Sequence, residues 1–384
     1  MQFQPPTPPR PSSVRTLAVL HPVFALTGVL HAVGGALLPS LAAHFHLSDS
    51  TSGLLFLLYF AGTSLGALLC RGSYARLLTM GFLAMVCTCI AVAVCPRSLL
   101  APAFLLLGVS VGVPMSAVTL FVGRAYPARC APLLTFLNFS WSIGALAAPL
   151  IAARVLMHHS YQSAYLLFAC ASAVAALASA LVLRDPPEPA RKPSGARSNT
   201  AFYLIAVFAF AAFLQVGIEN TVAAWLPTYA LRTTAAGLVL AAASTSFYWA
   251  GFLCSRGLSS LLLLRADPTR VFHIAVAVAF VSAFLLVFAP SVSTRNLAMF
   301  LLGASLAPTY PLVLAAFFAR SRHTADSRWI LFTAGFGGSV LPWIAGFTST
   351  HTGSLRTGML TIPAALFLMA FLLPILHQPV TKQA

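Results

Sequence analysis

The sequence predicts an all-α membrane protein in which twelve transmembrane helices form two pseudo-symmetric six-helix bundles. Of the 384 residues, 59% are apolar and only 7% are charged, whereas an ordinary soluble domain has roughly 25% charged residues. Apolar segments long enough to cross a bilayer recur along the whole chain, and the second half repeats features of the first. These observations exclude a water-soluble globular protein.

The spans follow from the lengths of the apolar segments. A helix that crosses the hydrocarbon core needs about 20 mostly apolar residues. A transmembrane barrel would instead need alternating strands of about ten residues, which the long unbroken apolar runs do not resemble. In chain order we expect twelve spans near residues 17–43, 51–70, 77–95, 98–121, 131–153, 163–183, 201–228, 233–254, 271–290, 297–319, 328–349 and 355–377.

The basic residues predict the orientation. With the N-terminus in the cytoplasm, 17 of the 22 basic residues lie in cytoplasmic segments and five lie in outer loops. This bias follows the positive-inside rule and places both termini in the cytoplasm. It also supports the number of spans, because a missed helix would invert every later loop. The formal net charge of +16 is scattered without a basic stripe, so we expect no nucleic-acid partner.

The longest polar stretch, RDPPEPARKPSGARSNT, holds four prolines and four basic residues and separates the sixth span from the seventh. Such a composition is typical of a linker. The proline-rich start of the chain lacks the features of a cleaved signal peptide. We therefore expect a disordered cytoplasmic arm over residues 1–16, an N-terminal six-helix bundle over 17–183, a linker over 184–200, a C-terminal six-helix bundle over 201–377 and a cytoplasmic tail over 378–384.

Three pairs of positions indicate an internal repeat at an offset of about 190 residues. The pairs are Gly66 before Arg71 with Gly251 before Arg256, LLLGVSVG around Gly108 with FLLGASLA around Gly303, and Gly144 before Pro149 with Gly337 before Pro342. Each pair alone is a weak signal, because glycine and proline are common in membrane helices. Three pairs in register are typical of a transporter built from parallel repeats.

Twelve spans in two similar halves with a central basic linker resemble the major facilitator superfamily over essentially the whole chain. The superfamily's loop signature after the second span is represented here by Gly66, Arg71, Gly72 and Arg76, without its acid. The segments GIENTVAAWLPTY, STSFYWAGFLCSRG, NFSWSIGALAAP and APTYP are most similar to the fucose, galactose and glucose:proton symporter branch. The resemblance implies a monosaccharide or polyol substrate and cation coupling through carboxylates facing a central cavity. Proton-coupled members of that branch place acids in the first and fourth spans, where this chain has none.

Glu219 is the one acid that falls within a predicted span. A charge at the bilayer centre costs roughly 2.5–3.5 kcal/mol, so such a residue normally faces a cavity or a partner. We expect Glu219 to bind substrate or carry a proton, with Gln215 one turn earlier on the same face as its hydrogen-bonding partner. The alternative is a protonated carboxyl that bonds a neighbouring helix and has only a structural role.

His31 is the second candidate for coupling. Aligning Gly28 with Gly217 places His31 opposite Asn220 and at a depth similar to that of Glu219. Histidine titrates near neutral pH, and a nearby glutamate would stabilise its cation. The alternative is a neutral His31 packed against polar backbone.

Aromatic residues suggest how a sugar would be held. Asn138, Trp141 and Ser142 share one helical face, so an indole that stacks on a pyranose would lie beside hydrogen-bonding groups. Trp225, Tyr248 and Tyr310 are further candidates for such a site, and packing in the core is the alternative for each of them. Arg71 and Arg256, at equivalent predicted helix ends, are candidates for a cytoplasmic gate or ordinary topology-setting charges.

The predicted function is secondary transport of a small polar solute, most simply a monosaccharide, across a bacterial inner membrane by alternating access. The alternatives are a proton-driven efflux antiporter for amphipathic metabolites or drugs, and a sugar uniporter. We expect no enzyme, because no clustered nucleophiles, carboxylates or known catalytic motifs are present. The seven cysteines show no metal-ligand spacing, so we expect no metal and no cofactor. The expected partners are the solute, a proton as coupling ion and the lipid bilayer, with the protein as a monomer.

Overall fold

The computed structural model describes residues 14–126, 130–185, 202–234, 237–263, 265–289, 291–318 and 327–376. The described residues are almost entirely helical and include no strand, so the predicted all-α class is confirmed. Most of the predicted arm at residues 1–16, most of the predicted linker at 184–200 and the tail at 378–384 lie outside the described residues.

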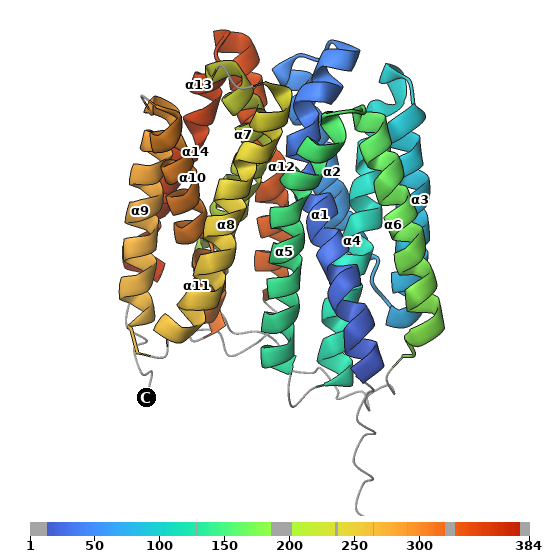
Figure 1. The fold of residues 1–384 in the computed structure, drawn as a ribbon. Coiled ribbons are helices and arrows are strands. Elements are labelled where there is room, and N and C mark those ends of the chain that lie inside the picture. Colours follow the sequence, from blue (N-terminus) through green and yellow to red (C-terminus); the bar gives the residue numbers. More distant parts are fainter. Residues whose placement is uncertain are drawn as a thin grey trace, which may run out of the picture.

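The first half of the chain forms six long helices (Figure 1). They are α1 Val14–Phe45, α2 Asp49–Leu68, α3 Tyr74–Val94, α4 Leu100–Ala125 preceded by the short 3₁₀ helix η1 Arg97–Leu99, α5 Cys130–Leu156 and α6 Tyr161–Val182. The second half forms α7 Phe202–Thr233, α8 Leu238–Leu262, α9 Pro268–Phe288, α10 Val292–Leu306, α11 Thr309–Phe318, α12 Ser327–Thr352, α13 Leu355–Met359 and α14 Thr361–Leu376. Eleven helical stretches of the described chain are long and apolar enough to cross a membrane. The 26-residue α12 lies among them in the bundle and completes twelve.

Two of the predicted spans are interrupted. The tenth is divided into α10 and α11 at Ala307 and Pro308, and the twelfth into α13 and α14 at Leu360. A proline lacks the backbone N–H that continues a helix, and its ring clashes with the preceding turn. Pro308 lies at the first interruption and Pro363 follows the second, which explains why each span breaks where it does.

The helices of the two halves pack in equivalent pairs. In the first half α1 packs on α5, α2 on α4 and α3 on α6; in the second α7 packs on α12, α8 on α10 and α9 on α14. The halves meet where α2 packs on α12, α5 on α8 and α1 on α7. This set of contacts is what a pseudo-twofold axis between the halves produces.

The glycines of the internal repeat are the points of closest helix approach. A Cβ placed on Gly108 would lie 2.0 Å from Tyr59 O, and one on Gly303 would lie 2.0 Å from Tyr248 O. Membrane helices use small residues in this way to bring backbones close together. The repeat seen in the sequence therefore records the same α4–α2 and α10–α8 contact made twice.

The two ends of the bundle differ. We call the end at which α1 begins and α8 finishes the terminal end, because the described chain starts there and α14 finishes there (Figure 1). We call the end at which α2 begins and α7 finishes the opposite end. Large apolar side chains such as Phe136, Leu240 and Phe367 are exposed on the sides of the bundle, as expected for surfaces that face lipid.

Candidate functional site

A cavity of about 250 Å³ lies between the two halves of the protein. Its volume is slightly below the roughly 300–1,000 Å³ of sites for drug-sized ligands, so it suits a smaller solute. Its lining comes from α1, α4, α5, α7, α8, α12 and the α10–α11 break: Phe24, His31, Met115, Asn138, Trp141, Val216, Glu219, Asn220, Phe252, Arg256, Ala307, Tyr310, Ala334 and Gly335. Six of the predicted substrate-binding residues, His31, Asn138, Trp141, Glu219, Asn220 and Tyr310, therefore share one cavity, and the predicted gate residue Arg256 lines it as well.

The cavity lies toward the terminal end of the bundle. Phe24 lies in the first half of α1, Asn138 and Trp141 lie in the first half of α5, and Arg256 lies near the end of α8. All of these positions are nearer to the terminal end than to the opposite end.

Glu219 and His31 have different neighbours. Glu219, on α7, interacts electrostatically with Arg256 of α8. The side chain of Asn220 approaches His31 across the α1–α7 interface and also packs against Gly338. The imidazole of His31 lies between two rings, 5.1 Å from Trp141 and 5.4 Å from Phe60. The structure thus places His31 beside Asn220 and Glu219 beside Arg256, within the same cavity.

Arg256 reaches from one half of the protein to the other. Its Nη1 donates a 3.1 Å hydrogen bond to Ser142 Oγ of α5. Its guanidinium carbon lies 4.7 Å from the ring centroid of Phe252 and 5.9 Å from that of Trp141, where the faces of the rings attract a cation. The cavity lining therefore includes a cation, a carboxyl group and the indole of Trp141.

The two arginines predicted to be equivalent occupy different environments. The helix that precedes Arg71 ends at Leu68, and Arg71 is exposed in a turn beside Gly72, which has a φ of +90°. The equivalent α8 instead continues to Leu262, so Arg256 lies inside a helix and faces the cavity. Matching the two halves of the sequence could not reveal this difference, because the difference depends on where each helix ends.

Trp141 is the aromatic residue of the cavity that best fits the predicted platform. Its side chain is mostly buried and packs edge-on against Trp249 of α8, with ring centroids 5.9 Å apart. On the same face of α5, Ser142 lies beside Arg256, and Asn138 Nδ2 donates to Leu134 O over 2.8 Å. The predicted shared face of Asn138, Trp141 and Ser142 is what the helix presents to the cavity and to α8.

Three predicted substrate-binding residues, Trp225, Tyr248 and Gln215, do not line the cavity. Trp225 is completely buried and donates from Nε1 to Pro342 O over 2.8 Å, so it joins α7 to α12 in the core. Tyr248 is also completely buried, although it interacts electrostatically with Glu219 and Arg256. The sequence does not distinguish these two residues from cavity residues, because it does not show which face of a helix borders the cavity.

Gln215 has a different partner from the one predicted. Its Nε2 donates a 3.1 Å hydrogen bond to Leu306 O, the carbonyl at the end of α10 where the tenth span breaks. The same oxygen accepts from Thr309 Oγ1 over 2.6 Å. Interrupted helices leave backbone groups that must be satisfied inside the protein. Gln215 meets this need and stabilises the break beside the cavity residues Ala307 and Tyr310.

Several buried polar atoms around the cavity have no hydrogen-bond partner among the described residues. They are His31 Nδ1, Trp141 Nε1, Trp249 Nε1, Tyr248 Oη and Gln215 Oε1. Most buried polar atoms in proteins are paired, so a cluster of unpaired ones is notable. Two of these atoms, His31 Nδ1 and Trp141 Nε1, belong to residues that line the cavity. In the described part of the chain, no three His, Cys, Asp or Glu side chains form a group that would hold a metal.

The family model described as Major Facilitator Superfamily matches residues 21–328. The chain is 25% identical over 362 residues to the glucose/galactose transporter of Brucella abortus, covering 86% of this chain and 87% of that protein.

Solved structures share the fold at low sequence identity. A D-xylose-proton symporter matches with a TM-score of 0.75 at 17% identity, covering 96% of this chain and 98% of the other. The fucose:proton symporter of E. coli matches with a TM-score of 0.63 at 18% identity, covering 96% and 100%. At these identities the likeness concerns the arrangement of the helices.

Proposed function

We propose that this chain, which belongs to the Major Facilitator Superfamily, is a secondary transporter that moves a monosaccharide through its central cavity by alternating access. The observation that carries the proposal is the cavity between the halves, where Trp141 offers a ring face beside Asn138, Asn220 and Glu219. A pyranose has an apolar C–H face that packs on an aromatic ring and hydroxyls that need amide or carboxyl partners. The likeness to a glucose/galactose transporter over most of both chains supports the same solute class.

The proposed setting is a bacterial inner membrane, with both termini and the linker in the cytoplasm. The distribution of basic residues supports this orientation. With the termini inside, the cavity lies toward the cytoplasm and the conformation is inward-facing. A reporter fused at Ala384 is then expected to be cytoplasmic, and a cysteine at Ser50 is expected to react from outside. Finding both positions on one side would contradict the orientation and the twelve-span count together.

The moving units of this proposal are the two six-helix halves, residues 17–183 and 201–377, which rock against each other while one polypeptide acts as a monomer. The equivalent helix pairs support this division, since the halves meet at the pseudo-symmetric contacts α2–α12 and α5–α8. Transporters built from such repeats bind their solute at the repeat interface.

Proton coupling through Glu219, with His31 as the alternative carrier, completes the proposal. The position of Glu219 supports proton coupling, because Glu219 is the acid that lines the cavity and it interacts with the charge of Arg256. A carboxyl group can either carry a proton or, when ionised, pair with an arginine. The change between these two states can link protonation to solute binding.

Binding and transport can be tested separately. Purified protein in detergent is mixed with single monosaccharides, polyols and amphipathic compounds, and thermal unfolding is recorded, since only a ligand that prefers the folded state raises the unfolding temperature. The stabilising sugar is then used in counterflow with the protein in proteoliposomes. Stabilisation and counterflow by a hexose are expected. Stabilisation by amphipathic compounds alone would reject the sugar proposal and favour an exporter.

A further inference from the structure

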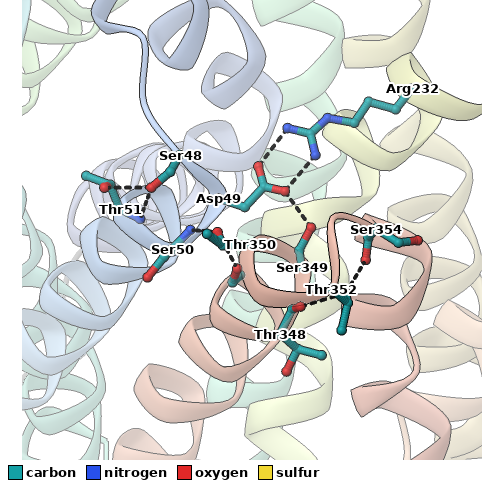
Figure 2. A network of polar contacts seen from close by, with 11 residues as sticks. Ser48, Asp49, Ser50, Thr51, Arg232, Thr348, Ser349, Thr350, Thr352 and Ser354 are labelled. Carbon is teal, nitrogen blue, oxygen red and sulfur yellow. Dashed lines mark hydrogen bonds and ion pairs between the residues drawn. The ribbon is translucent and has the colours of Figure 1, made fainter.

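Five residues at the opposite end of the bundle join the two halves through a compact polar network (Figure 2). Asp49, the first residue of α2, forms an ion pair with Arg232 near the end of α7, with two N–O distances of 2.6 Å. Ser349 Oγ of α12 donates to Asp49 Oδ2 over 2.5 Å. The backbone N–H of Ser50 donates to Thr350 Oγ1 of α12 over 2.7 Å. We call Asp49, Ser50, Arg232, Ser349 and Thr350 the Asp49 cluster.

The chemistry of helix ends explains why these residues occur there. The first N–H groups of a helix have no partner within the helix. In α2, Ser48 Oγ satisfies Thr51 N, and Thr350 of the other half satisfies Ser50 N. An acid is favoured at a helix N-terminus and a base at a C-terminus because of the helix dipole. Asp49 and Arg232 lie at such ends, so the two helix ends attract each other only when the halves are in contact.

The helices are tightly packed around the cluster. A Cβ placed on Gly346 of α12 would lie 2.4 Å from Asp49 O, so α12 contacts the backbone of the first turn of α2. The side chain of Asp49 is 11% exposed and that of Arg232 is 46% exposed. The pair is thus partly shielded from water, and its bidentate geometry makes it stronger than a typical surface ion pair.

The cluster and the cavity lie at different levels of the bundle. The cavity lies toward the terminal end, whereas α2 begins and α7 and α12 finish at the opposite end. For the cavity to be reached from the opposite end, α2 must separate from α7 and α12. That separation breaks the ion pair and both cross-half hydrogen bonds together.

We propose that the Asp49 cluster is the gate on the opposite end, closed in this conformation and broken whenever the cavity opens to that side. The inference rests on the proposed alternating-access function and adds the residues that set its conformational balance. The ion pair stabilises only the state that is closed at this end. Removing it therefore shifts the equilibrium toward the open state. High salt acts in the same direction by screening the two charges.

The gate can be tested without a substrate. Ser52 lies one turn after Asp49 on the same helical face and is buried, with 1% exposure. In a Ser52→Cys protein, the rate of labelling by a charged, impermeant maleimide applied from the outer side reports opening at this end. The protein that keeps Ser52 is the control, because any labelling of it comes from the native cysteines. Adding Asp49→Asn is expected to raise the rate roughly fivefold, as loss of about 1 kcal/mol of ion-pair energy predicts.

Matched variants separate a gate from a general loss of structure. Asp267 is likewise an acid at the start of a helix, where it accepts from Arg270 N over 3.1 Å, but this bond lies within one helix end. Asp267→Asn is expected to leave the labelling of Ser52→Cys unchanged. The charge exchange Asp49→Arg with Arg232→Asp is expected to restore slow labelling. If Asp49→Asn does not fold, Arg232→Gln removes the same pair from its more exposed side.

Unchanged labelling in both Asp49→Asn and Arg232→Gln, or an equal rise in Asp267→Asn, would overturn the gate. Failure of the transport proposal is a separate result, read from sugar binding and counterflow. Faster labelling without any sugar transport would keep the gate as a conformational contact and reject the sugar.

Discussion

Arg256 Nη1 donates to Ser142 Oγ over 3.1 Å, and this bond joins α8 in one half of the protein to α5 in the other. It lies at the cavity beside Trp141 and within electrostatic range of Glu219. Arg256 is therefore connected to the aromatic surface, to the carboxyl and to the contact between the halves. A residue that touches all three is expected to respond both to solute and to movement of the halves.

Arg256→Gln is expected to reduce counterflow of the transported sugar by at least tenfold, because Glu219 loses its counter-charge and Ser142 loses its donor. Sugar uptake into proteoliposomes measures the effect. Arg71→Gln is the matched control, since Arg71 is exposed in a turn, and it is expected to keep most of the activity. Equal losses in both variants would mean that Arg256 does not act through the cavity.

Trp141→Ala is expected to weaken sugar binding by about 1–2 kcal/mol, a factor of 5–30, through loss of the ring face. Titration calorimetry on the purified protein measures the affinity. Trp225→Phe removes the bond to Pro342 O in the core instead, so its expected effect is a lower unfolding temperature with unchanged affinity. If Trp141→Ala lowers stability and leaves affinity intact, Trp141 is a packing residue.

Glu219→Gln keeps the size of the side chain and an acceptor oxygen but fixes the group in a neutral state. Sugar exchange down its gradient is expected to persist, because a neutral loaded carrier needs no change in charge to move. Accumulation driven by an imposed pH gradient is expected to disappear. Accumulation that continues in proteoliposomes would exclude Glu219 as the proton carrier and leave His31, another ion or uniport.

Gln215→Leu is expected to lower the unfolding temperature, since the amide that bonds Leu306 O at the α10–α11 break is lost. Leu306 O keeps its bond from Thr309 Oγ1, so the expected loss is that of one net hydrogen bond, about 0.5–1.5 kcal/mol. Differential scanning fluorimetry in detergent measures the shift. Thr309→Val removes the second donor to the same oxygen, so a decrease in unfolding temperature is expected for this variant too. No change in either variant would mean that the break does not depend on these bonds.

Gly303→Ala is expected to destabilise the protein by about 1–3 kcal/mol, because the added Cβ would lie 2.0 Å from Tyr248 O and force α8 and α10 apart. Gly257→Ala is the control, as nothing lies within 4 Å of a Cβ added there. Thermal unfolding of both purified variants checks the difference. Similar stability of the two would contradict the close α8–α10 contact.

The sequence alone determined the class of the fold. Composition and the lengths of apolar runs require membrane helices, because a bilayer accepts only backbone that satisfies its own hydrogen bonds. The glycine pairs around Gly108 and Gly303 predicted the internal repeat, since close helix approach needs the same small residue wherever the same contact is made. Glu219 was equally visible, because an ionisable residue in an apolar segment is costly unless it has a function or a partner.

Only the tertiary structure decided which polar and aromatic residues share a cavity. Trp141 and Trp225 both lie within predicted spans, yet one lines the cavity and the other bonds Pro342 O in the core. Arg256 faces Glu219 and Arg71 does not, because α8 extends beyond its arginine and α2 ends before the equivalent one. The Asp49–Arg232 pair joins residues 183 positions apart. Such facts depend on helix rotation, helix length and the contact between the halves, which arise from packing of many side chains together and leave no periodic signal in the sequence.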